Sequence, residues 1–154
     1  MQDLPKRKIN RLQNYDYAQT GAYFVTICTK DTKWLFGSID GGTMTLNKNG
    51  IIAESEMLKI SSHFNYVDIS NYVVMPNHVH LIVVIMPAGA ASGAPTMTIG
   101  SIIRGYKSGV SRLMGFSPWQ RNYHDHVIRN QEDYNRIAEY IGNNPARWAE
   151  DRYY

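Results

Sequence analysis

The chain has 154 residues, of which 44% are hydrophobic and 19% are charged. This length suits one hydrophobic core, and the composition excludes an intrinsically disordered protein. The formal net charge of +3 permits a polyanionic partner without requiring one. Cys28 is the single cysteine, so no disulfide framework forms within the chain and a reducing compartment is expected.

Neither a secretion signal nor a membrane segment is predicted. Residues 1–8 carry charges, but no apolar run follows them, so they do not form a signal peptide. The longest strongly apolar run, from Leu81 to Met86, is too short to cross a membrane. We therefore expect a cytoplasmic protein that has no membrane partner.

The N-terminal segment, residues 1–20, is polar and predicts an irregular basic arm. Its cations are Lys6, Arg7, Lys8 and Arg11. Residues 22–29 are rich in β-branched and aromatic side chains, and they predict a strand near the centre of a sheet. A hairpin is expected next, because two short strands, 35–39 and 44–46, flank the glycine-containing turn 40–43.

The middle of the chain predicts one helix and a second pair of strands. The helix is expected over residues 50–63, with Asn47 or Asn49 as its N-cap. Strands over residues 67–74 and 78–85 follow. The segment between them contains a proline, which donates no hydrogen bond to a sheet and therefore indicates a turn.

The C-terminal half predicts two helices and one strand. Residues 87–95 are small and of low complexity, which predicts a flexible connector. A helix from 98 or 101 to about 113, a strand over 119–128 and a last helix over 131–143 follow. Antiparallel strands interleaved with helices predict an α+β fold, in which a central antiparallel β-sheet carries helices on its faces, within a single domain over residues 1–154.

His78 and His80 occupy alternate positions of a predicted strand, so both imidazoles point to one face while Val79 points into the core. Two neutral imidazoles side by side suit a divalent metal. Such a pair is also common as ordinary surface histidines, but here a proline turn and an apolar run hold it on a rigid element. A second pair, His124 and His126, lies in a more polar segment and is the weaker candidate.

The last predicted helix carries a tyrosine and an amide on one flank. At about 100° per residue, Tyr134 falls on the buried stripe and Tyr140 falls beside it. Tyr140 and Asn144 are four residues apart and project together. From geometry alone Tyr140 is better read as a half-exposed helix tyrosine, and Asn144 also suits a helix end. Asp133 lies on the same flank and suits an acidic residue of the first helical turn.

These motifs, in this order, resemble those of the HUH-type single-tyrosine transposases, above all the REP-associated tyrosine transposases. The matching segments are Met75-Pro76-Asn77-His78-Val79-His80-Leu81-Ile82-Val83, Trp119, Tyr123-His124-Asp125-His126-Val127-Ile128-Arg129-Asn130, Tyr140-Ile141-Gly142-Asn143-Asn144-Pro145 and Trp148. The resemblance runs from about Ala22 to Trp148. It implies the ferredoxin-like fold of HUH endonucleases and an enzyme that cuts and rejoins single-stranded DNA next to hairpins made by repeated palindromes.

The resemblance assigns the metal ligands to His78, His80 and Asn144, and the nucleophile to Tyr140. The expected cofactor is Mg²⁺ or Mn²⁺, and the imidazoles favour Mn²⁺. Attack by Tyr140 is implied to leave a 5′-phosphotyrosine and a free 3′-hydroxyl. Two residues are accessory candidates for proton transfer, namely His126 and Asp133.

The resemblance implies that the partner is single-stranded or hairpin DNA. It also implies that the protein is nucleoid-associated and has no small-molecule substrate. Either a monomer or a homodimer is compatible with this, and Tyr140 acts in its own subunit or in a partner's. Beyond the N-terminal arm, candidate phosphate-binding cations are Arg104, Lys107, Arg112, Arg121 and Arg129.

Other functions remain open from the sequence. One is a non-catalytic nucleic-acid-binding module on the same scaffold. A second is a metal-dependent hydrolase that uses water, with Zn²⁺ on His78, His80 and one of His124 or His126. A replication initiator or relaxase, which shares the chemistry, is less well supported because the chain is small and this site has a single tyrosine.

Overall fold

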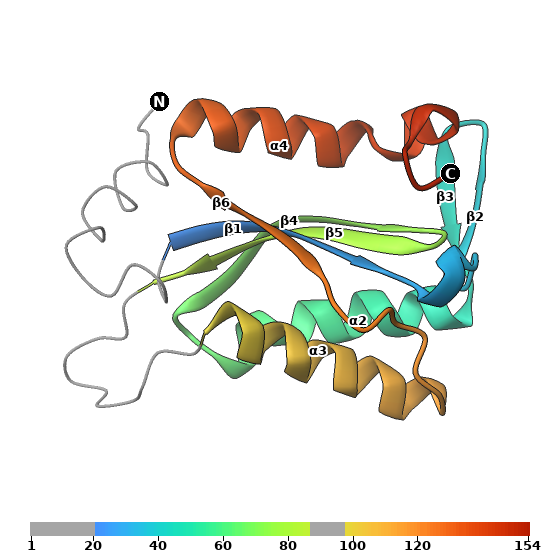
Figure 1. Cartoon of the computed structure of the whole chain (residues 1–154), viewed down its shortest axis with the longest axis horizontal. Coiled ribbons are helices and arrows are strands. Elements are labelled where there is room, and N and C mark those ends of the chain that lie inside the picture. The colour runs from blue at the N-terminus through green and yellow to red at the C-terminus, as the bar shows by residue number, and fades with distance from the viewer. Residues whose placement is uncertain (1–20, 87–97) are drawn as a thin grey trace.

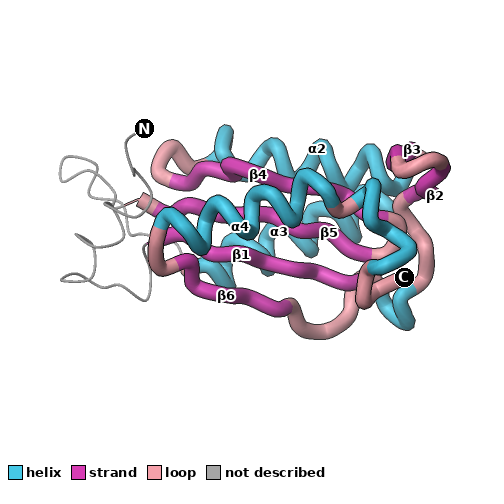
Figure 2. The backbone as a smooth tube through the Cα atoms, turned by 90° about the horizontal axis from the view of Figure 1, so that it is seen from above, coloured by secondary structure: helices cyan, strands magenta, loops and turns pink. Residues whose placement is uncertain are grey.

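The computed structural model describes residues 21–86 and 98–154, and its centre is an antiparallel sheet of four strands in the order β4-β5-β1-β6 (Figure 2). The strands are β1 (Gly21–Cys28), β4 (Val67–Met75), β5 (His78–Ile85) and β6 (His124–Ile128). A separate hairpin, β2 (Gly37–Asp40) and β3 (Thr43–Leu46), lies at the end of the sheet near the C-terminus (Figure 1). The hairpin was predicted, although its first strand begins later than expected.

Helices cover both faces of the sheet (Figure 1). α2 (Lys48–His63) and α3 (Ile99–Met114) lie together on one face, and α4 (Gln131–Asn143) lies on the other. Two short 3₁₀ helices complete the described chain, η1 (Lys30–Thr32) after β1 and η2 (Pro145–Glu150) after α4. The predicted α+β class, with a central antiparallel sheet and helices on its faces, is therefore confirmed.

Short polar side chains fix where the helices begin. Asn47, Thr98 and Asn130 each accept a hydrogen bond from a backbone N–H three residues later, as N-caps do. These contacts decide between the alternatives that the sequence left open, because Asn47 rather than Asn49 and Thr98 rather than Ser101 precede their helices.

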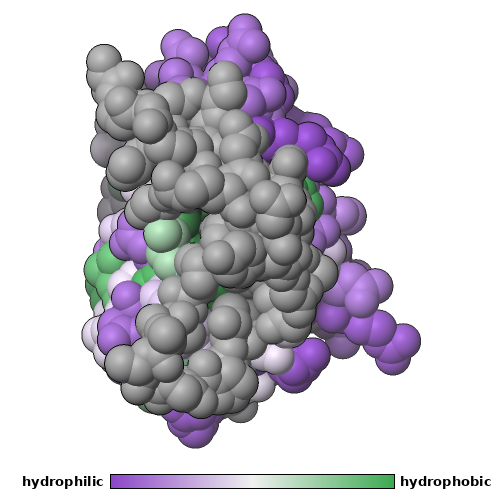
Figure 3. All heavy atoms as spheres, turned by 90° about the vertical axis from the view of Figure 1, so that its left-hand side faces the viewer, coloured by the Kyte–Doolittle hydropathy of each residue, from purple (hydrophilic) through white to green (hydrophobic). Residues whose placement is uncertain are grey.

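Strand alternation divides the interior into two layers. The larger core lies between the sheet and α2 and α3, and from β5 it takes Val79, Leu81, Val83 and Ile85. A smaller core lies under α4, where Ile82 of the same strand packs with residues of β1, β6 and α4. At the end of the molecule drawn in Figure 3, the described surface over α4 is hydrophilic, so this helix buries one side and exposes the other.

The predicted strand over 119–128 is wrong in its first half, because β6 begins at His124. Trp119 makes one isolated bridge, to Thr29, and its buried indole donates a hydrogen bond to the carbonyl of Lys107. The Lys107 amino group in turn donates to the carbonyls of Gln120 and Arg121. Contacts with α3 therefore bind two of the carbonyls that a continued strand would offer to a neighbour.

Two predictions lie outside the described residues, namely the basic arm over residues 1–20 and the connector over 87–95. In the part of the chain that the structure describes, no helix combines the length and the apolar character that crossing a membrane requires.

Candidate metal and tyrosine site

The two histidines of β5 lie side by side beneath α4. Both His78 and His80 are buried, and their Nε2 atoms are 3.1 Å apart. Val79, between them, belongs to the larger core on the other face of the sheet. Their predicted arrangement on one face of a rigid strand is thus the arrangement observed.

Asn77 fixes the protonation of His78. Its Nδ2 donates to the carbonyl of Tyr153 at 2.6 Å and, with a longer contact, to that of Thr32 at 3.4 Å. Because carbonyls only accept, the Asn77 Oδ1 must be the atom that faces His78. His78 Nδ1 therefore carries the proton and donates to Oδ1 at 2.8 Å, which leaves His78 Nε2 as a bare acceptor.

Thr26 holds the outer nitrogen of the other imidazole. It stands opposite His80 on β1, with its Oγ1 2.9 Å from His80 Nδ1. A hydroxyl both donates and accepts. When His80 Nε2–H donates to the bare nitrogen of His78, Thr26 donates to His80 Nδ1. If both Nε2 atoms bound a cation, His80 would carry its proton on Nδ1, and Thr26 would accept a hydrogen bond from that N–H.

Burial keeps both imidazoles neutral. Loss of solvent lowers the pKa of His78 to about 4, although the Asp151 carboxylate and the Asn144 side chain act in the opposite direction. Burial, and then the neighbouring His78, lower the pKa of His80 well below its ordinary value. The neutral imidazole is the form that binds a metal ion.

The C-terminal segment adds a carboxylate that the sequence analysis missed. Ligand atoms of His78, His80 and Asp151 lie within 4.8 Å of one another, and His78 Nε2 is 3.9 Å from Asp151 Oδ2. The ring of Tyr153 covers the pair, with its centroid 4.6 Å from that of His78. No periodicity or spacing linked Asp151 to β5, because η2 turns the chain back over the site.

Asn144 lies buried at the end of α4, beside Asp151. Its Nδ2 donates to Asp151 Oδ2 at 2.9 Å, while its Oδ1 is buried and has no hydrogen-bond partner among the described residues. Such orphan oxygens are uncommon, and an oxygen is the ligand that hard cations prefer. Two imidazole nitrogens, a carboxylate and an amide oxygen together form a donor set that suits Mn²⁺ or Mg²⁺.

Tyr140 is partly exposed above the buried histidines. Tyr140 is 41% exposed, and its ring centroid is 5.3 Å from that of His80. Burial and then Asp151 raise the pKa of the Tyr140 phenol, against Asn144 and Arg152, which lower it. A hollow of about 580 Å³ opens beside Tyr140, so this side chain is reachable from solvent. Its lining includes Arg136, Arg147 and Arg152.

The two accessory candidates lie together, but at the other end of α4. His126 Nε2 is 2.9 Å from Asp133 Oδ2, and the second oxygen of Asp133 accepts a hydrogen bond from Arg136. Burial raises the pKa of Asp133, but the hydrogen bond and charge of His126, with the help of Arg136, hold it below its ordinary value. These contacts join α4 to β6, about two turns of helix from Tyr140.

The remaining candidates divide by position. Arg104, Lys107 and Arg121 line one hollow beside α3, whereas Arg112 and Arg129 are exposed elsewhere. His124 and His126 are absent from the histidine and aspartate group of the described residues. The cations of residues 1–20 lie outside the described part of the chain.

Two solved structures share this architecture. A REP-associated tyrosine transposase bound to a REP hairpin superposes with a TM-score of 0.65 at 23% identity, over 87% of this chain and 72% of that chain. A candidate transposase from Deinococcus radiodurans R1 gives a TM-score of 0.52 at 17% identity, over 84% of this chain and 94% of that chain. The fold is therefore that of the HUH-type single-tyrosine transposases, as the motifs predicted.

Sequence comparison identifies a relative of nearly full length. A protein of Haemophilus influenzae (strain ATCC 51907 / DSM 11121 / KW20 / Rd), described as uncharacterized, is 37% identical over 167 residues, which span 96% of this chain and 93% of the relative. No protein-family profile matches the chain. The chain belongs to one family with the Haemophilus protein.

Proposed function

We propose that the protein is a metal-dependent endonuclease and strand transferase that acts on single-stranded DNA near hairpins through Tyr140. The observation that supports this best is the contact of the Tyr140 ring with His80, at a centroid distance of 5.3 Å, next to a group of possible metal ligands. A nucleophile beside a metal group is what phosphodiester transfer requires. The shared fold supports the same class of enzyme.

His78 and His80 would hold the metal ion, with Asn144 and Asp151 supplying oxygen ligands. When bound, Mg²⁺ or Mn²⁺ would polarise a phosphate oxygen and reduce the energy needed to ionise the phenol. Asp151 raises the pKa of Tyr140, so a cation held by that carboxylate would make the phenol easier to ionise. Arg136 and Arg147 of the neighbouring hollow already pair with Asp133 and Glu150, so Arg152 would bind the adjoining phosphate.

Cleavage would be a transfer between two phosphate esters. The Tyr140 oxygen forms a bond to phosphorus while the bond from phosphorus to the 3′-oxygen breaks. The phenol loses a proton, and the departing 3′-oxygen gains one. The product is a 5′-phosphotyrosine with a free 3′-hydroxyl, and the retained ester bond allows rejoining without a nucleotide cofactor.

The proposed partner is single-stranded or hairpin DNA. We propose that the protein acts on it in the cytoplasm, in association with the nucleoid. One similar structure is described as bound to a REP hairpin, which supports this kind of partner. Tyr140 contacts His80 of its own chain, so the proposal is that one subunit supplies both the metal ligands and the nucleophile.

The test compares wild type with Tyr140→Phe on a pool of labelled DNA hairpins with single-stranded flanks, in Mn²⁺, on a denaturing gel. We expect a covalent protein–DNA band that Tyr140→Phe abolishes. The control is Tyr134→Phe, on the same helix, whose hydroxyl bonds Ser70 and Asn71 instead of the site. Cleavage that persists in Tyr140→Phe would indicate a water-using hydrolase, and hairpin binding without cleavage would indicate a binding module.

A further inference from the structure

A second hollow lies on the opposite side of the sheet from Tyr140. It has a volume of about 770 Å³ and lies between α3 and residues 117–123, which lead into β6. Ile103 and Trp119 line it from the larger core, which packs on the face away from α4. The hollow is thus separated from the metal and tyrosine site by the sheet itself, and we refer to it as the α3 groove.

The lining of the α3 groove has one sign of charge. Its charged residues are Arg104, Lys107 and Arg121, and no carboxylate of the described residues lines it. Lys107 bonds the carbonyls of Gln120 and Arg121 at 2.8 and 3.2 Å and so joins the two walls of the groove. Arg104 and Arg121 are exposed and form no ion pair with any described residue. The groove therefore presents to an anionic ligand two guanidinium groups that pair with no carboxylate in the described part of the chain.

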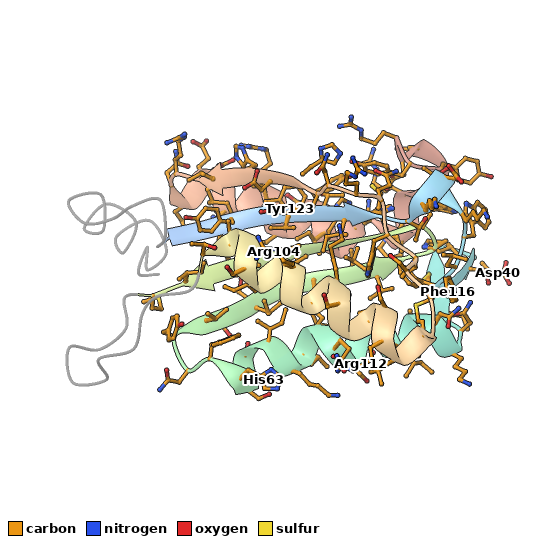
Figure 4. All side chains as sticks on the ribbon, turned by 60° about the horizontal axis from the view of Figure 1, so that its bottom comes forward. Asp40, His63, Arg104, Arg112, Phe116 and Tyr123 are labelled. Atoms are coloured by element: carbon orange, nitrogen blue, oxygen red, sulfur yellow. The ribbon has the colours of Figure 1, made fainter. Side chains whose placement is uncertain are left out.

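The mouth of the groove gathers donors around Gly100. A Cβ at Gly100 would lie 3.6 Å from the hydroxyl of Tyr123 and 4.0 Å from a guanidinium nitrogen of Arg104. Figure 4 shows Arg104 beside Tyr123, while Arg112 lies further along α3. A phenol hydroxyl and a guanidinium that face one point are both able to donate hydrogen bonds to a phosphate oxygen.

We propose that the α3 groove binds backbone phosphates of the hairpin stem, outside the segment that Tyr140 cuts. The inference rests on the proposed function, because DNA as the substrate comes from it. β6 is the edge strand, so a nucleic acid is able to pass round it from the α3 groove to the tyrosine side. Phosphate contacts of this kind hold DNA in register without reading its sequence.

The test measures binding of a labelled DNA hairpin with a random-sequence stem by fluorescence anisotropy over a series of salt concentrations. All proteins carry Tyr140→Phe so that the DNA stays intact. Because phosphate contacts are sequence-independent, any stem serves as a probe. Arg104→Gln and Arg121→Gln should each weaken binding roughly fivefold and reduce the salt slope by about 1. The control is Arg112→Gln, on the same helix but outside the groove.

A second pair of variants separates charge from bulk. Gly100→Glu introduces a carboxylate at the mouth, in the first turn of α3, where an acidic residue favours the helix. It should weaken DNA binding roughly tenfold while the melting temperature does not fall. Gly100→Gln, of the same size, should retain most of the affinity.

Two results would overturn the inference. In the first, Arg104→Gln and Arg121→Gln both bind the hairpin with the same affinity and the same salt slope as the parent protein and as Arg112→Gln. The other is no hairpin binding by the parent protein. The covalent adduct is measured separately, on protein that retains Tyr140. If the adduct forms but the groove variants bind DNA normally, only the inference about the groove is wrong. If the groove variants lose binding but no adduct forms, only the proposed tyrosine chemistry is wrong.

Discussion

At the scale of single residues, the histidine pair is governed by the groups on its outer nitrogens. Asn77 allows His78 only the neutral form with the proton on Nδ1, because the Asn77 amide nitrogen already donates to backbone carbonyls. Thr26 allows His80 either arrangement, because a hydroxyl donates or accepts. Outer hydrogen bonds of this kind orient metal-binding imidazoles and commonly alter metal affinity 10- to 100-fold, by an order-of-magnitude estimate.

Replacing Thr26 should therefore weaken metal binding. Thr26→Val keeps the shape of the side chain but leaves the buried Nδ1 of His80, 2.9 Å from the lost hydroxyl, without a partner. We expect the dissociation constant for Mn²⁺ to rise roughly tenfold or more in Thr26→Val, and to stay near the wild-type value in Thr26→Ser. Titration of free Mn²⁺ by electron paramagnetic resonance measures both. Equal affinity in Thr26→Val would remove the hydroxyl from this role.

Burial of the pair also makes stability depend on pH. The pKa of His78 falls from an ordinary 6.5 to about 4 on folding, so the unfolded chain binds more protons between these values. The stabilisation is complete above pH 6.5 and is lost as the pH falls toward 4. Urea unfolding of the metal-free protein should show the unfolding free energy falling by up to about 1.4 kcal/mol per pH unit for each such histidine.

The matched variant for this pH effect is His78→Gln, which removes the titrating group. Its unfolding free energy should fall less steeply with decreasing pH over the same range. If wild type and His78→Gln lose stability in parallel, other groups account for the acid sensitivity.

At the scale of elements, α4 is held on the sheet by a small apolar layer and by polar contacts to β4 and β6. Ile137 and Ile141 are buried against Ile82 and Ile128. The contact between His126 and Asp133, at 2.9 Å, joins the first turn of the helix to the edge strand. Tyr140 directly precedes Ile141, so packing of this isoleucine determines where the nucleophile lies.

Truncation of that packing should affect the tyrosine more than the metal. Ile141 is 2% exposed, and Ile141→Ala should lower the unfolding free energy by about 2–5 kcal/mol. Because three of the four proposed ligands, His78, His80 and Asp151, lie outside α4, we expect covalent adduct formation to fall further than Mn²⁺ affinity. Chemical denaturation, the gel assay and Mn²⁺ titration test the three quantities. Leu58→Ala, at a residue 53% exposed on α2, provides the stability control.

Most elements could be predicted because their causes are local. Alternation along residues 78–85 and the caps Asn47 and Thr98 act within a few residues, and they give the bounds of β5, α2 and α3. Residues 119–123 were wrongly predicted as strand, and Lys107 from α3 binds the carbonyls of two of them, Gln120 and Arg121. That contact depends on the tertiary fold, and no local pattern records it.

At the scale of the whole molecule, the site joins segments that are distant in the sequence. β5 supplies the histidines, β1 supplies Thr26, α4 supplies Tyr140 and Asn144, and the C-terminal segment supplies Asp151. The family resemblance singled out the first and third of these as site residues. Asp151 could not be found from the sequence, because a lone carboxylate after a 3₁₀ helix has no pattern and reaches the pair only through the turn at Pro145.

A metal ion bound to these groups would connect the C-terminal segment and α4 to the sheet, so it should stabilise the entire fold. A ligand that binds only the folded state at a hundredfold excess over its dissociation constant contributes about 2.7 kcal/mol. For a chain of this size that free energy corresponds to a rise in melting temperature of roughly 5–10 °C. Wild type should therefore melt higher in Mn²⁺ than in chelator. His78→Gln should lose the difference, and His126→Gln should keep it, since His126 bonds Asp133 instead of the ligand group. An equal rise in His78→Gln would mean that Mn²⁺ stabilises the protein from somewhere other than the histidine pair.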